Sequence, residues 1–135
     1  MITEVADALC AKLEEIEGLR ASPVAVDVPH PPMAVVSLTD VDYHVVMGGN
    51  TAILNYRISL VCGRSNDRGG WAQLEELLDP HSDSSVRAKL LEDPTLGGVA
   101  STLGVGTAID IGSVAQQDSS YIVASLEVEV YGVRG

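Results

Sequence analysis

The amino-acid sequence predicts an α+β domain in which helices pack on one face of an antiparallel or mixed β-sheet of about five strands. In some segments apolar residues recur at steps of three and four, which is typical of amphipathic helices. In others they alternate with polar residues, which is typical of strands covered on one side. The length of 135 residues fits a single domain over residues 1–135, and a hydrophobic content of 46% is enough for one continuous core.

Three helices are predicted, over residues 3–17, 71–78 and 83–92. The residues that share the apolar face of the first helix are Val5, Leu9, Leu13 and Ile16. Thr3 is expected to cap this helix and Gly18 to end it, because a hydroxyl satisfies free N–H groups and glycine tolerates a left-handed backbone. Asp67 is expected to cap the second helix, which Pro80 ends.

The predicted strands cover residues 33–38, 43–47, 54–62, 105–114 and 120–131. The prolines of residues 19–32 deny backbone donors to a sheet, so this segment is expected to be an extended connection. Gly48, Gly49 and Asn50 lie between two apolar runs, which predicts a hairpin turn.

Composition narrows the possible functions. Nineteen acidic and eight basic residues give a formal net charge of −11, so phosphate backbones and anionic membranes should repel the chain. The chain has no Phe and one Trp, which argues against sites that stack sugars or bases on aromatic rings. No apolar run reaches the roughly 20 residues that span a bilayer. Cys10 and Cys62, without a signal-peptide pattern before them, predict unbridged thiols in a reducing compartment.

Asp40, Asp42 and His44 stand at alternate positions, so in an extended segment they would share one face and offer oxygen and imidazole ligands to a divalent metal. A polar strand edge or a loop facing water explains the same residues. No pattern supplies a fourth ligand, since His30 and His81 lie in separate proline-flanked turns. We therefore expect no metal and no other cofactor.

Glu127 and Glu129 are two positions apart on a predicted strand, about 6.6 Å by backbone rise. This lies near the roughly 6.5–9.5 Å separation of the carboxylates in inverting glycosidases. The missing aromatic platforms oppose that activity, and Arg57 on another strand could form a surface ion pair with one of the two. With no nucleophile motif in the chain either, we expect a protein that is not an enzyme.

The segment from Gly63 to Gly70 is a glycine-rich turn before a helix, but it matches neither phosphate-binding loop motif. Its Arg64 and Arg68 are rare positive charges on an acidic protein and are candidates for a subunit contact. The predicted hairpin around Gly48, Gly49 and Asn50 is a second candidate, because exposed strand edges tend to pair.

A succession of short segments, in the same order over nearly the whole chain, resembles siphophage tail terminator proteins. The segments are Leu19-Arg20 before the proline-rich stretch, Val41-Asp42-Tyr43, Val61-Cys62-Gly63-Arg64 running into Asp67-Arg68, Ser85-Val86-Arg87-Ala88, Asp93-Pro94-Thr95-Leu96-Gly97-Gly98 and Leu126-Glu127-Val128-Glu129-Val130-Tyr131.

The resemblance implies a virion structural protein that is assembled in the bacterial host cytoplasm. It implies a hexameric ring at the head-proximal end of the tail, in contact with the major tail tube protein and with head–tail connector or neck proteins. Such a ring stops tube polymerisation, and the net charge of −11 per copy is expected to let DNA pass without specific binding. The alternatives are a connector or other neck protein and, from another class, a small metal-dependent or acid–base enzyme using Asp40, Asp42 and His44 or Glu127 and Glu129.

Overall fold

The structure is a computed structural model that describes residues 2–16, 18–23, 32–43, 53–64, 68–116 and 119–131. The described residues form three α-helices, a 3₁₀ turn and one five-stranded mixed sheet, which confirms the predicted α+β class. The helices are α1 (Ile2–Glu14), α2 (Arg68–Leu78) and α3 (Val86–Leu91), and the 3₁₀ turn is η1 (Leu96–Gly98). The strands are β1 (Arg20–Ser22), β2 (Met33–Asp42), β3 (Ile53–Arg64), β4 (Thr102–Gln116) and β5 (Ser119–Tyr131).

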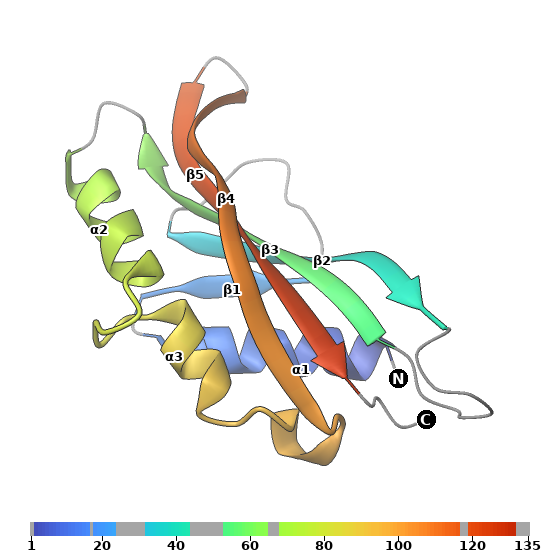
Figure 1. Cartoon of the computed structure of the whole chain (residues 1–135). Coiled ribbons are helices and arrows are strands. Elements are labelled where there is room, and N and C mark those ends of the chain that lie inside the picture. The colour runs from blue at the N-terminus through green and yellow to red at the C-terminus, as the bar shows by residue number, and fades with distance from the viewer. Residues whose placement is uncertain are drawn as a thin grey trace.

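The strands lie in the order β1-β2-β3-β5-β4 (Figure 1). β1 pairs with β2 in parallel over three residues, and the other neighbouring pairs are antiparallel. β4 is therefore one edge of the sheet. No described strand pairs with the other side of β2 beyond Val35, so the second half of β2 forms the opposite edge.

Alternation in β3 and β5 gives the sheet two different faces. Even-numbered residues are buried under the helices from Leu54 to Cys62 in β3 and from Ile122 to Val130 in β5. Odd-numbered residues lie on the face opposite the helices, which we call the outer face. This is the pattern expected of an antiparallel sheet with a core on one side.

All three helices pack on the inner face (Figure 1). Helix α1 lies against β1 and β2 and touches α3, and it buries Leu9 and Leu13 completely. Helix α2 crosses β3 and β5. Gly70 permits this close approach, because a Cβ placed there would lie 3.0 Å from the carbonyl oxygen of Cys62. The packing produces one aliphatic core that also contains Tyr56.

The first helix differs from its prediction at both ends. It begins at Ile2, so Thr3 lies inside α1 instead of capping it. It ends at Glu14, and the N–H groups of Glu15 and Ile16 bond to carbonyls only three residues back, which tightens the last turn. Gly18 has the predicted left-handed backbone, with φ 81°, but it lies beyond this turn and does not follow the helix directly.

The predicted end of a strand at Leu38 is wrong. β2 continues to Asp42, because a register shift between Leu38 and Asp40 lets the polar residues go on pairing with β3. The segment 19–32 also contains strand β1, which a purely extended connection would not have. Residues 44–47 of the predicted strand 43–47, and the predicted turn of Gly48, Gly49 and Asn50, lie outside the described residues.

The third helix is shorter than predicted, and Ser85 caps it by accepting the Ala88 N–H at 3.1 Å. The predicted strand 105–114 is the 15-residue β4, which contains two register shifts, one between Val105 and Ala108 and one between Ile109 and Gly112. At the second shift Asp110 has φ 54°, a left-handed conformation that interrupts the edge ladder. The predicted cap Asp67 lies outside the described residues.

Candidate functional site

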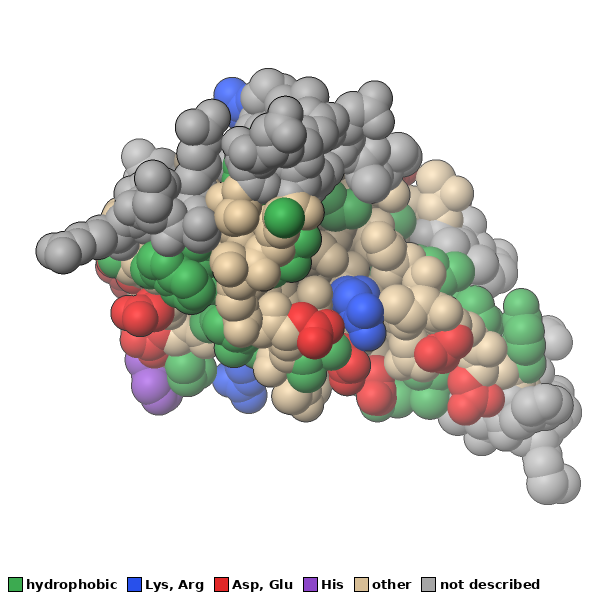
Figure 2. Space-filling view, turned by 90° about the horizontal axis from the view of Figure 1, so that it is seen from above, with side chains coloured by type: hydrophobic (Ala, Val, Ile, Leu, Met, Phe, Trp, Pro, Cys, Tyr) green, Lys and Arg blue, Asp and Glu red, His purple; other side chains and the backbone are tan. Residues whose placement is uncertain are grey.

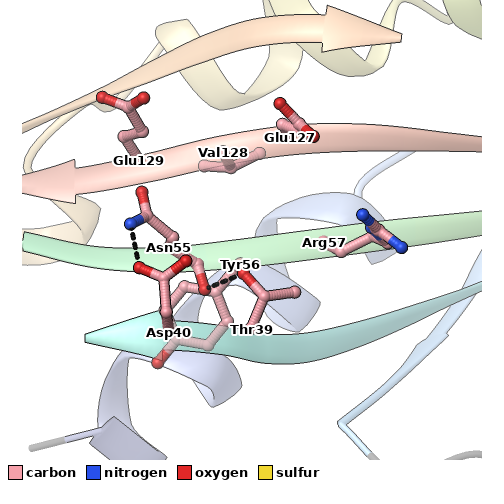
Figure 3. Close-up of a pocket in the computed structure, with 8 residues that line it drawn as sticks. All are labelled: Thr39, Asp40, Asn55, Tyr56, Arg57, Glu127, Val128 and Glu129. Carbon is pink, nitrogen blue, oxygen red and sulfur yellow. Dashed lines mark hydrogen bonds between the residues drawn. The ribbon is translucent and has the colours of Figure 1, made fainter. Parts of the chain in front are cut away.

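The outer face, which no described helix covers, carries a polar pocket of about 200 Å³, which we call the outer pocket. Its lining residues are Thr39, Asp40, Asn55, Tyr56, Arg57, Glu127, Val128 and Glu129 (Figure 3). Strand register builds it: Asn55 of β3 stands between Asp40 of β2 and Glu129 of β5, and Arg57 stands opposite Glu127. Asp40 and the two glutamates therefore line one pocket, although the sequence analysis considered them as parts of two separate candidate sites.

Hydrogen bonds organise one side of the outer pocket. The Asn55 side-chain amide donates to the Asp40 carboxylate, and the Thr39 hydroxyl donates to the Asn55 carbonyl at 2.9 Å (Figure 3). The Tyr131 hydroxyl donates to the Glu129 carboxylate, and this bond raises the pKa of Tyr131. Two of the three carboxylates therefore already accept hydrogen bonds within the chain.

Arg57 does not form the predicted ion pair with Glu127 or Glu129 among the described residues. Its guanidinium lies toward one end of the outer pocket and Asp40 toward the other (Figure 3). The Arg57 Nε atom is buried without a hydrogen-bond partner. Among the described side chains of the face seen from above, Figure 2 shows acidic groups around a basic one.

The metal hypothesis gains no support from the described residues, which contain no group of three or more His, Cys, Asp or Glu side chains that could hold an ion. Asp40 and Asp42 lie in β2, and His44 lies outside the described part of the chain. Glu127 and Glu129 are both exposed on the outer face, as their spacing predicts. The enzyme alternative based on them stays a prediction.

For Arg64 and Arg68, the two candidates for a subunit contact, the structure describes the position of the backbone only. Arg64 is the last residue of β3 and Arg68 the first of α2, with residues 65–67 between them outside the described ranges. Gly63 has φ 141° beside a register shift in β3, so this position favours glycine.

A second surface, at the edge of the sheet, was not expected from the sequence. It is a groove of about 430 Å³, which we call the β4 groove. Its lining residues are Leu78, Pro80, His81, Arg87, Val105, Gly106, Thr107, Ala108 and Leu126. The groove lies where the first register shift of β4 meets the end of α2 and the start of α3. The only sequence signal was Gly104 and Gly106, since glycine inside a strand often marks a bulge.

Large apolar side chains are exposed at both edges of the sheet. On the β2 side Leu38 is 39% exposed and Tyr43, just after the strand, is 72% exposed. On β4 the exposed fractions are 55% for Ile111 and 51% for Val114. Isolated apolar residues on a surface are ordinary, but residues gathered on unpaired strand edges mark places where another chain can bind.

The reactivity of the two cysteine thiols provides a test of how the core is packed. Cys10 and Cys62 are free and buried, and burial raises the pKa of each from 9.0 to about 11. A raised folded-state pKa disfavours the reactive thiolate, so at about pH 8 a disulfide reagent should label the native protein slowly and the urea-unfolded protein at once. The associated stability is present below about pH 9 and lost as the pH rises toward about 11. Rapid labelling of either native thiol would contradict this packing.

None of the helices in the described ranges is long and apolar enough to cross a membrane. A scan against protein-family models and a search of curated proteins found no match to this chain.

Proposed function

We propose that this protein is a phage structural subunit, a tail terminator that forms a ring on the head-proximal end of the tail tube. In this role the ring stops polymerisation of the major tail tube protein and joins the tail to connector or neck proteins. The ordered series of sequence segments that resembles terminators supports the proposal. Three of these segments end strands of the sheet: Val41-Asp42-Tyr43 ends β2, Val61-Cys62-Gly63-Arg64 ends β3 and Leu126–Tyr131 ends β5.

One structural observation carries the proposal furthest, namely two unlike edges on opposite sides of one sheet. β4 bears exposed Ile111 and Val114, and the second half of β2 bears exposed Leu38. A closed ring of identical chains needs heterologous contacts, in which one patch meets a different patch on the next copy. An edge at each side of the subunit meets that requirement, whereas a single patch would favour a two-fold dimer.

The acidity of the outer face supports the proposal that DNA passes through the ring. Asp40, Glu127 and Glu129 lie there with the partly shielded Arg57, and each copy adds a formal charge of −11. Adhesion to a phosphate backbone requires cations, so an acidic wall would let DNA slide without binding. The same charge makes the copies repel one another.

The proposal predicts a salt-dependent ring. Purified protein studied by light scattering and negative-stain imaging should form rings of about six subunits, and raising salt from low to moderate concentration should favour them because salt screens repulsion. Weaker assembly on adding salt would contradict the repulsion argument. Absence of rings both in solution and on purified tail tubes would contradict the proposed function.

A head–tail connector would satisfy the same ring geometry. The two roles differ in their target: a terminator added to polymerising tail tube protein should shorten the tubes and remain at one end. A connector should leave tube length unchanged and bind the capsid side of the neck.

A further inference from the structure

The direction of the strands allows one subunit to continue the sheet of the next. β2 is antiparallel to β3, β3 to β5 and β5 to β4, so β4 runs opposite to β2. If two copies stand side by side in the same orientation, the β4 edge of one faces the β2 edge of the other. The strands at that junction are antiparallel, like those on either side of it. No inversion of either copy is needed.

The register places an exposed side chain of the β2 edge and the β4 groove at the same level of the sheet. Leu38 pairs with Tyr56, Tyr56 with Val128 and Val128 with Val105, so these four residues form one row across the sheet. Directly opposed residues of antiparallel strands lie on the same face. Tyr56 and Val128 are buried under the helices, and Leu38 and Val105 therefore lie on that face too.

Leu38 is thus an exposed aliphatic side chain at one end of the row, and the β4 groove opens beside Val105 at the other end. The groove is lined by aliphatic side chains that include Leu78 and Leu126. Its volume of about 430 Å³ falls within the roughly 300–1,000 Å³ of binding pockets. An apolar side chain that enters the groove would remove apolar surface of both partners from water.

Charge favours the same pairing. The β2 edge from Ser37 to Tyr43 carries no cation, and its two carboxylates, Asp40 and Asp42, pair with outer-face residues of β3 and so lie on the outer face of the sheet. The groove is bounded by His81 and by Arg87, which is exposed and forms no ion pair with any described residue. The nearby Asp79 carboxylate accepts the His81 backbone N–H at 2.8 Å. An acidic β2 edge and a groove that carries Arg87 differ in sign across the thickness of one sheet, so charge favours their approach without a direct ion pair at Leu38.

We infer that the β4 groove is the docking site for the β2 edge of a second copy of this chain, with Leu38 inserted beside Val105 and Leu126. This inference rests on the proposed function, because it specifies the contact between neighbours in the ring. The two register shifts of β4 interrupt its edge ladder, so side chains carry this contact rather than a continuous ladder of backbone hydrogen bonds.

Crosslinking tests which edges meet. We would place one cysteine on each edge, in the separate variants Ser37→Cys and Thr107→Cys, and treat them with a short bis-maleimide. Both positions are exposed, and the two native cysteines are buried. The mixture of the two variants should give a crosslinked dimer, each variant alone should give little, and a chain carrying both changes should give a ladder of oligomers. Ala11→Cys, exposed on α1, is the control for random collision.

Substitution of Leu38 tests the apolar contact. Leu38→Ser should weaken self-association at least about tenfold, as expected for a side chain that fills a pocket in a partner. Leu38→Met keeps the apolar volume and should stay within about threefold of the wild type. The urea unfolding midpoint of each monomer, measured alongside, separates lost assembly from lost folding.

Two results would overturn the inference. One is crosslinking in the mixture no stronger than with Ala11→Cys, and the other is equal assembly by the wild type and Leu38→Ser. If the wild type forms rings and either of these results is obtained, the contact is wrong while the proposed function stands. If the edges crosslink as expected but the assemblies are open chains that do not cap tail tubes, the contact stands and the terminator role fails.

Discussion

Replacing Leu9 with alanine should lower the free energy of unfolding by about 2–5 kcal/mol. Leu9 is fully buried in the middle of α1, where it belongs to the core shared by the helices and the sheet. Its truncation removes apolar contacts and leaves a cavity that the surrounding β-sheet can only partly fill. Since domains are stable by about 5–15 kcal/mol, this single change would remove a large share of the stability.

The measurement is urea unfolding followed by circular dichroism, with the midpoint and slope compared between variants. Leu9→Met preserves most of the volume and should cost less than about 1.5 kcal/mol. A loss below about 1 kcal/mol for Leu9→Ala would mean that α1 does not pack on the sheet as described.

Replacing Gly70 with valine should destabilise the protein by about 1–3 kcal/mol, through overpacking rather than a cavity. A Cβ at this position would lie 3.0 Å from the Cys62 carbonyl oxygen and 3.0 Å from the Ile122 Cδ1 atom. The carbonyl belongs to β3 inside the sheet, so helix α2 would have to move outward. That movement would displace Leu78 at the end of α2, and we expect self-association through the β4 groove to weaken as well.

Gly69 provides the matched control, because it is the preceding residue of the same helix and is exposed. Gly69→Ala should be neutral or stabilising by up to about 1 kcal/mol, since alanine has the higher helix propensity. Unfolding curves of the two variants, with light scattering of each, test both statements. Equal stability of Gly70→Val and Gly69→Ala would exclude the close approach of α2 to β3.

Local periodicity predicted the elements with a strong one-sided pattern. Val5, Leu9, Leu13 and Ile16 are all buried, as their spacing on the first helix requires. The alternation in β5 likewise separates a buried row from an outer row that includes Glu127 and Glu129. Such patterns work because the direction of a side chain depends on its own backbone.

The misplaced elements are those whose conformation depends on a partner. Arg20-Ala21-Ser22 has no strand pattern and becomes β1 because it lies beside Met33-Ala34-Val35 of β2. The strand predicted from Met33 ends at Leu38, yet β2 extends to Asp42 because β3 continues to pair with it. Context of this kind overrides local strand preference.

For the candidate sites too, some features follow from the sequence and others only from the tertiary structure. The sequence by itself determined the acidity, the aliphatic core, the fold class and which residues of α1, β3 and β5 face inward, because these follow from composition and from the fixed periods of the backbone. Only the tertiary structure decided that Asp40 and Glu129 lie on either side of Asn55 and that β4 and the second half of β2 form opposite edges. It also decided that Leu38 and the β4 groove lie at the two ends of one row of residues. These features depend on which distant strands become neighbours and in what register, and that choice is made by packing of the whole chain.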